Sequence, residues 1–216
     1  MYPEARLPLP TLGVGRLAKV RAGWAQPAVI GAAAWQLSEL SGRLTELCGA
    51  GATAALTLAA RLVLTAQQAG EPVAWLTTTA ACVYPPDLAA HGIDLAALPI
   101  VRVPDTAAIG RAADQLARSG AFGLLIMDLA PIGRLPEAQV TRLLGLAQRH
   151  GTALVCLSGK PGGAPSVSPL VSLRGEVTWS RQGPGCFHVE LTALKDKRRS
   201  PGWRHAEVCH GPVGVR

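Results

Sequence analysis

A glycine-containing turn follows an apolar run of strand length and is the first place in the chain where chemistry could occur. Residues 49–55 read Gly-Ala-Gly-Ala-Thr-Ala-Ala. A turn of this kind between a strand and a helix can hold a phosphate on its backbone N–H groups. The P-loop that binds nucleoside triphosphates has the pattern G-x-x-x-x-G-K-[ST], in which the lysine neutralises phosphate charge and the hydroxyl holds magnesium. Counted from Gly49, the last three P-loop positions are Ala54, Ala55 and Leu56.

The groups that act on a triphosphate are therefore missing from this turn. No lysine occurs between Lys19 and Lys160, so no shift of the frame restores the P-loop cation. Phosphoryl transfer depends on positioning and charge neutralisation, and we expect no ATPase activity and no bound cofactor. The remnants of a nucleotide site would be Gly49, Gly51 and Thr53 in this turn, together with Asp128 at the end of a later strand.

Asp128 ends a second apolar run of strand length, at Leu124–Asp128. Its carboxylate could be a leftover magnesium ligand, or it could hydrogen-bond the turn that follows the strand. We favour the hydrogen-bonding role, because a magnesium ligand has little use without a phosphate cradle. The histidines and cysteines show no ligand spacing with one another or with carboxylates, so we expect no metal site.

The densest charged segment is Leu194–Pro201, which carries four cations, Lys195, Lys197, Arg198 and Arg199. A solvated hairpin tip is the simplest interpretation of such a run, and contact with a partner is the alternative. Trp203 follows the segment and could stack on a base or an interface, or pack against the last strand. The basic stretch from Arg6 to Arg21 would be a flexible arm, or would bind DNA phosphates or an acidic partner.

The composition limits the class of protein. The 216 residues are 49% apolar and 16% charged, which is enough for one full-sized core. A formal charge of +7 admits nucleic acid or an acidic partner, although the codon bias of a GC-rich genome would produce the same arginine excess. No apolar run reaches the length of a membrane span and the first twenty residues are no secretory signal, so we expect a cytoplasmic protein without membrane contact.

The elements that must position these residues alternate between strands and helices. Strands are expected at Arg43–Cys48, Val73–Thr77, Leu98–Val103, Leu124–Asp128 and Ala153–Leu157. Apolar residues recur with helical period over two intervening segments, at positions 109, 112, 113 and 116 and at positions 140, 143, 144 and 147. Asp105 and Pro136 fit a helix cap and a first-turn proline. This alternation predicts an α/β fold with a mostly parallel sheet flanked by helices.

The C-terminal part has a different pattern. After a loop at residues 160–169, three strands are expected at Leu170–Ser180, Cys186–Leu194 and Trp203–Cys209, extending the sheet as antiparallel hairpins. Trp75 and Trp179 lie in apolar strands and are expected in the core. We divide the chain into an N-terminal extension at 1–40, a core domain at 41–210 and a tail at 211–216. The five cysteines are odd in number and read as small buried side chains.

Several stretches in this order resemble the core of the bacterial RecA recombinase family. Residues 42–49 and 56–58 resemble the strand before that family's P-loop and the helix after it, and residues 91–95 resemble the segment before its third strand. The densest match combines residues 104–106, 116–121 and 124–128, which are similar to the helix and Walker B strand of RecA. The resemblance spans residues 40–205 and implies a RecA-like core.

The departures from RecA fall in the sites that bind nucleotide and DNA. The family's catalytic Glu aligns near Thr79, and its nucleotide-sensing Gln aligns with the Ser158–Gly159 pair. The first DNA-binding loop is missing, and the second is reduced to the loop at 160–169. Lys195 and Lys197 match the two lysines that, in RecA, reach into the ATP site of the neighbouring subunit.

A short RecA-like chain with a degenerate P-loop is similar to the ImuA family, the RecA-like members of the bacterial ImuA and ImuB mutagenesis cassette. That resemblance implies an accessory of SOS-induced, error-prone translesion synthesis. The implied partners are RecA, an ImuB-type protein related to the Y-family polymerases, and the error-prone polymerase. The alternative is a DNA-binding repair accessory whose basic surface binds the phosphates of single-stranded DNA. Partner contact would use Lys195, Lys197, Arg198, Arg199 and Trp203.

Overall fold

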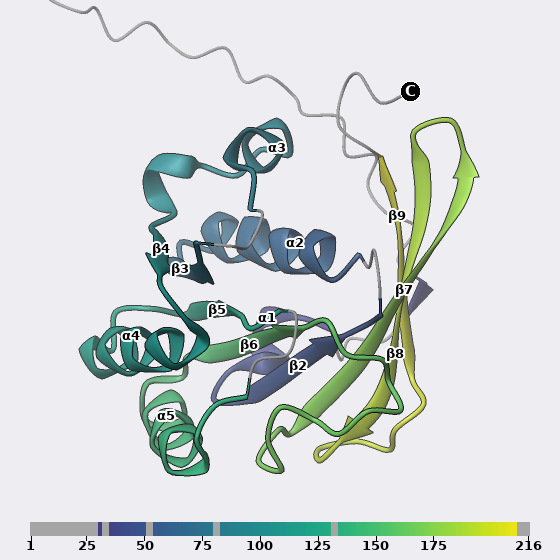
Figure 1. Ribbon diagram of the computed structural model, residues 1–216. Helices are drawn as coiled ribbons and strands as arrows, with labels where there is room; N and C mark the ends of the chain where they lie inside the picture. The colour runs from purple at the N-terminus through teal and green to yellow at the C-terminus, as the bar shows by residue number, and fades with distance from the viewer. Residues whose placement is uncertain (1–29, 32–34, 51–53, 80–82, 131–133, 211–216) are drawn as a thin grey trace, which may run out of the picture.

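A single nine-stranded sheet forms the centre of the molecule (Figure 1), and its strand order is β1-β9-β8-β7-β2-β6-β5-β3-β4. The computed structural model describes residues 30–31, 35–50, 54–79, 83–130 and 134–210. The strands are β1 (Ile30–Gly31), β2 (Leu44–Cys48), β3 (Val73–Thr78), β4 (Ile100–Val103), β5 (Leu124–Asp128), β6 (Ala153–Ser158), β7 (Leu173–Gly183), β8 (Cys186–Asp196) and β9 (Arg204–His210). The helices are α1 (Leu37–Leu40), α2 (Ala55–Gln68), α3 (Pro85–Ala90), the 3-10 turn η1 (Leu95–Ala97), α4 (Thr106–Ser119) and α5 (Glu137–His150).

The sheet is parallel through its centre and antiparallel at one side. β2 pairs in parallel with β6 and β7, and β3 pairs in parallel with β4 and β5. β7, β8 and β9 form antiparallel hairpins, and β1 adds to β9. The predicted α/β class, with a mostly parallel sheet and an antiparallel C-terminal edge, is confirmed, and the arrangement is consistent with a RecA-like core.

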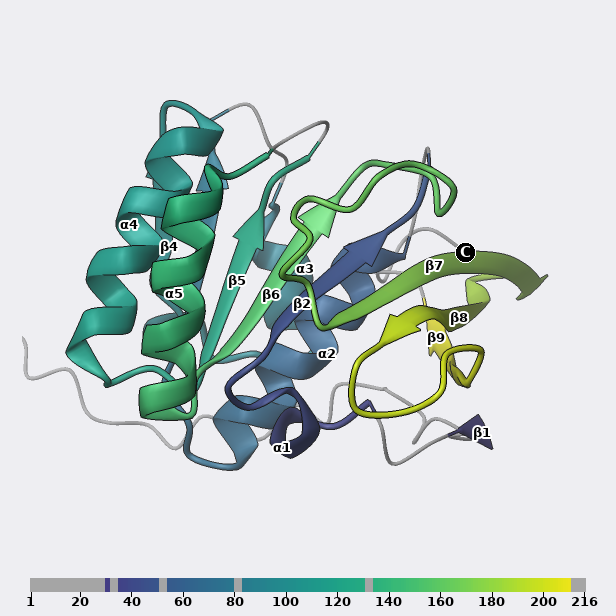
Figure 2. The same ribbon diagram turned by 90° about the horizontal axis from the view of Figure 1, so that it is seen from below.

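Helices cover both faces of the parallel strands (Figures 1 and 2). α2 packs on one face together with α1 and α3, and its buried side chains include Leu58 and Val63. α4 and α5 lie side by side on the opposite face, where Ile109 and Leu143 enter a second apolar cluster. The inner strands between the two layers, β2, β3, β5 and β6, are buried along their whole length. This double cover is the reason for their continuous apolar sequences.

Local signals set the helix ends much as the sequence predicted. Asp105 caps α4, and its Oδ1 accepts a hydrogen bond from the Ala108 N–H at 2.7 Å. The same helix ends at Gly120, whose φ of +67° is the left-handed conformation that glycine adopts without strain. Pro136 occupies the cap position of α5 rather than its first turn, so that expectation was off by one residue.

One expected core residue is exposed. Trp75 is buried in β3 as expected, but 46% of the Trp179 surface is exposed. Beyond Glu176, which pairs with Thr192 of β8 and Cys48 of β2, β7 continues past the end of β2 as part of an arm that also contains β8 and β9. Trp179 lies on this arm and stacks edge-on against Phe187, with ring centroids 5.5 Å apart. The arm extends past the body of the molecule (Figure 1).

The folded core includes residues before position 41. Trp35 and Leu40 are buried among the core side chains, and Ile30 and Gly31 pair with β9. The predicted tail at 211–216 and residues 1–29 lie outside the described residues. No helix of the described part is long and apolar enough to cross a membrane.

Candidate functional site

The two groups of residues singled out in the sequence lie at opposite edges of the sheet. The carboxyl edge is the edge at which β2, β3, β5 and β6 end, and it holds Gly49 and Asp128. The amino edge is where the same strands begin. β8 runs antiparallel to β7, and the pairing of Asp196 with Leu173 and of Leu173 with Thr45 places the end of β8 beside the start of β2. The basic segment that begins at Lys195 is therefore at the amino edge.

At the carboxyl edge, Asp128 hydrogen-bonds within the fold. Its Oδ1 accepts from the Ala130 N–H at 3.2 Å, and its Oδ2 accepts from the Thr77 hydroxyl at 3.3 Å. Burial raises the pKa of Asp128, and these two hydrogen bonds partly oppose the shift. In the described part of the chain no cation pairs with this carboxylate. These two hydrogen bonds are the ones that the favoured hydrogen-bonding role would use.

The turn after β2 keeps little of a phosphate site. Gly49 is buried, whereas Gly51 and Thr53 lie outside the described residues. α2 starts at Ala55, and its cap residue Ala54 provides no side-chain hydrogen bond. The positions that the sequence resemblance matched to the catalytic Glu and the sensing Gln of RecA make hydrogen bonds within the fold. The Thr79 N–H donates to a β4 carbonyl at 3.2 Å, and the Ser158 hydroxyl donates to Glu46 at 2.7 Å.

Glu46 is the site residue that sequence reasoning missed. Its carboxylate is fully buried in the middle of β2, with one oxygen accepting from Ser158. The other oxygen accepts from the Ser166 hydroxyl and from the Val167 N–H at 3.1 Å, and the Arg174 guanidinium lies 3.4 Å away. Glu46 thereby fastens the loop at 160–169 to the sheet. A glutamate inside an otherwise apolar run was the only signal in the sequence.

Apolar side chains are exposed around the carboxyl edge. Leu56, in the first turn of α2, is 44% exposed, and Tyr84, which precedes α3, is 60% exposed. Trp179 lies on the arm that β7 forms beyond the same edge. The position at which a P-loop has its hydroxyl is thus an exposed leucine, and this edge offers apolar contacts where a nucleotide site would offer charge.

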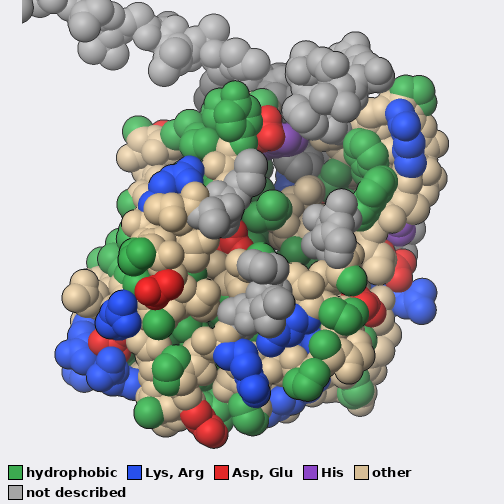
Figure 3. Space-filling view, in the orientation of Figure 1, with side chains coloured by type: hydrophobic (Ala, Val, Ile, Leu, Met, Phe, Trp, Pro, Cys, Tyr) green, Lys and Arg blue, Asp and Glu red, His purple; other side chains and the backbone are tan. Residues whose placement is uncertain are grey.

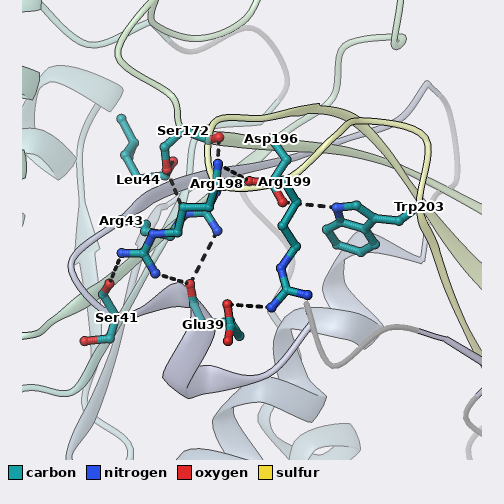
Figure 4. Close-up of polar contacts among 9 residues, drawn as sticks. All are labelled: Glu39, Ser41, Arg43, Leu44, Ser172, Asp196, Arg198, Arg199 and Trp203. Carbon is teal, nitrogen blue, oxygen red and sulfur yellow. Dashed lines mark hydrogen bonds and ion pairs between the residues drawn. The ribbon is translucent and has the colours of Figure 1, made fainter.

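At the amino edge, Asp196 organises the basic segment (Figure 4). Its Oδ1 accepts from the Arg43 guanidinium at 2.6 Å and from the Arg198 backbone N–H at 2.9 Å. Its Oδ2 accepts from the Trp203 indole N–H at 3.0 Å. Burial alone would raise the pKa of Asp196, but these hydrogen bonds and the Arg43 charge outweigh burial and hold the pKa below its ordinary value.

Arg198 and Arg199 attach the segment to the start of the core. The Arg198 guanidinium donates to the carbonyls of Glu39 and Ser41, at 3.0 and 3.2 Å, and thereby satisfies acceptors at the end of α1 (Figure 4). Arg199 pairs with the Glu39 carboxylate at 3.0 Å. Both of these predicted partner-binding cations therefore contact the chain itself.

The two lysines differ in their availability. The Lys195 ammonium donates to the Pro169 carbonyl at 3.2 Å, and partial burial and the Lys197 charge lower its pKa. Lys197 is exposed, and its side chain has no polar partner among the described residues, while its backbone N–H is held by the Ser172 carbonyl at 2.8 Å. The fold thus brings Lys195, Lys197, Arg198, Arg199 and Trp203 together around Asp196, with Lys197 pointing to solvent from a fixed backbone.

The described residues contain no group of three or more His, Cys, Asp or Glu side chains that could hold a metal ion. Cys48, Cys156 and Cys209 are buried thiols, and Cys186 is half-buried. Cys82 lies outside the described residues.

Neither the known protein-family models nor the curated proteins include a match to this chain.

Proposed function

We propose that the chain is a non-catalytic, RecA-like accessory protein of SOS-induced, error-prone translesion synthesis that acts in the cytoplasm through contacts with RecA and an ImuB-type protein. The contact with RecA is made by the amino edge, and Lys197 is its principal cation. Lys195 belongs to the same surface, but its ammonium can contact the partner only after its hydrogen bond to the Pro169 carbonyl breaks. The error-prone polymerase is reached through the ImuB-type partner.

The observation that carries this proposal is the separation of two unlike surfaces on opposite edges of one sheet. The amino edge presents an exposed lysine on a segment anchored by Asp196. The carboxyl edge has lost the P-loop groups and exposes Leu56 and Trp179. A head-to-tail contact uses a different surface on each partner and continues indefinitely when every subunit has both surfaces. A chain with only one competent edge joins the end of a filament and stops it.

Charge provides the attraction at the amino edge. The Lys197 ammonium can approach a nucleotide held by a terminal RecA subunit, because phosphate oxygens attract a compact cation strongly. Arg198 and Arg199 hold the backbone in place and would lose their contacts with α1 if they moved to the partner. We therefore assign them to positioning and Lys197 to binding.

Co-purification with RecA tests the proposal. The full chain is mixed with RecA in the presence and absence of ATP and single-stranded DNA. We expect capture to require ATP and to fall at least about tenfold in Lys197→Ala, the loss of one charge-assisted contact of about 1.4 kcal/mol or more. Lys160→Ala is the matched control, because it removes the same charge from the loop after β6. Equal capture by both variants and the wild type, or capture independent of ATP, would refute the docking surface.

A parallel measurement tests the non-catalytic assignment. Equilibrium dialysis with labelled ATP should give no saturable binding, because the turn has no lysine and Leu56 occupies the position of the P-loop hydroxyl. Saturable binding or hydrolysis above background by the purified chain would overturn the assignment even if RecA were captured.

A further inference from the structure

Two arginines from neighbouring helices share one buried carboxylate on the surface of α4 and α5. Arg118 Nε donates to Asp114 Oδ2 at 2.9 Å, and Arg142 Nε donates to Asp114 Oδ1 at 2.6 Å. The Asp114 side chain is only 7% exposed, whereas the arginine side chains are 57% and 54% exposed. Within the described residues the terminal Nη groups of both arginines have no partner. Asp114 therefore fixes two guanidinium groups and leaves their outer N–H donors in solvent.

Two more arginines extend this pair along the helices. Arg111 precedes Arg118 by two helical turns on α4, and Arg149 follows Arg142 by two turns on α5. Both are exposed, and the described part of the chain gives neither of them a partner. Two turns span about 10 Å, and packed helices lie about 8–10 Å apart. We call these four residues the arginine surface; Lys and Arg side chains gather over α4 in Figure 3.

The surroundings of the arginine surface favour one kind of ligand. Asp114 and Glu137 are the only acidic residues of the two helices, and Glu137 lies in the first turn of α5. None of the large apolar side chains that are exposed in the described part belongs to α4 or α5. A peptide partner usually needs an apolar or aromatic anchor, and unpaired bases usually need an aromatic platform. Neither is present, which leaves a polyanion recognised through its backbone.

We propose that the arginine surface binds the phosphate backbone of duplex DNA without reading its sequence. Planar guanidinium groups donate in pairs to phosphate oxygens, and contacts of this kind position a protein on a duplex. Asp114 is a positioning residue that fixes two of the four contacts. The proposal is independent of the contact with RecA, because the arginine surface is on a helical face and Lys197 is at the amino edge of the sheet.

Salt dependence of duplex binding tests this surface. Fluorescence anisotropy of a short labelled duplex should give a slope of log K against log salt of about −3.6 for four phosphate contacts, a loss of roughly 10²-fold between about 50 and 200 mM salt. The double variant Arg111→Gln with Arg149→Gln should reduce the magnitude of the slope by about two units, because fewer counterions leave the DNA when two phosphate contacts are lost. These two side chains hold nothing in the described fold, so the variant should remain folded.

Two further variants separate contact from net charge. Arg181→Gln with Arg204→Gln removes the same charge from β7 and β9 and should leave the slope unchanged. Arg118→Gln and Arg142→Gln with Asp114→Asn removes only one net positive charge, yet it should also reduce the slope by about two units. Equal effects of the two double variants would refute the surface. The surface would also be refuted if the chain bound a polyglutamate peptide through the same arginines but did not bind the duplex.

Discussion

Arg43 and Asp196 are 153 positions apart in the chain, and their side chains form a buried ion pair at 2.6 Å. The two side chains are only 3% and 1% exposed. Arg43 immediately precedes β2 and Asp196 ends β8, so the pair ties the central parallel strand to the antiparallel side of the sheet. The position of the basic segment is therefore set in part by a residue that is distant in the chain but adjacent in the fold.

Replacing one member of this pair should be costly. Asp196→Asn leaves the Arg43 charge buried without a counter-charge, and we expect the free energy of unfolding to fall by about 3–5 kcal/mol. Lys197→Ala, one residue later and exposed, should change it by no more than about 0.5 kcal/mol. Urea unfolding followed by circular dichroism measures both. Similar losses in the two variants would contradict the assigned roles.

Acid should weaken the fold through two carboxylates. The pKa of Asp196 is held below its ordinary value, and so is that of Glu207, where hydrogen bonds from His205 and Arg61 and the Arg61 charge outweigh burial. The folded state therefore binds fewer protons than the unfolded state in acid. The stabilisation is complete above the ordinary pKa values, near about 4, and is lost as pH falls through the lower folded values. Urea unfolding should show this loss, and Asp196→Asn should show less of it.

Glu46 should control the loop at 160–169. Glu46→Gln removes the charge that holds the Ser166 hydroxyl and the Val167 N–H, so the amides of this loop should exchange with deuterium about tenfold or more faster. The amides of α5 should keep their wild-type rates. If the folded variant kept wild-type exchange rates in this loop, contacts other than those of Glu46 would hold the loop on the sheet and the prediction would be wrong.

The thiols should differ in reactivity. Burial raises the pKa of Cys48 to about 11 and that of Cys209 to about 11, and it raises the pKa of Cys156 further. Thiolates carry the reactivity, so these three should resist alkylation in the native state and react after unfolding. Cys186 is half-buried and should react before them. Peptide-level mass spectrometry after brief alkylation at pH 8 follows each site separately.

The central strands could be predicted because both of their faces are covered. β5 has the predicted bounds, and β2 and β6 differ from the prediction by one residue at one end. Continuous apolar runs are typical of such strands. The same reasoning was wrong for Trp179, because β7 continues beyond the end of its parallel partner β2. The sequence pattern shows which segments are apolar, but it does not show whether a helix or a neighbouring strand covers each of them.

The sequence predicted which residues form the candidate site, but it did not predict the contacts that they make with the rest of the chain. The basic segment was found from its charge density, and its residues do lie together. That Arg198 and Arg199 contact α1 depends on a distant turn, Glu39–Ser41, which no local pattern connects to them. The absence of the P-loop lysine and hydroxyl from residues 49–56 could be read directly, since it rests on residue types. The anchoring of the loop at 160–169 by Glu46 required the register of β2 against β6.

The length distribution of RecA filaments on single-stranded DNA, measured by electron microscopy, tests the proposed role most directly. Substoichiometric amounts of the wild-type chain should shorten the filaments, because each bound chain blocks one end. The variant with Lys195→Ala and Lys197→Ala should leave their length unchanged, and Lys160→Ala should act like the wild type. Filaments of unaltered length with the wild-type chain, or shortening that persists without the two lysines, would contradict the account.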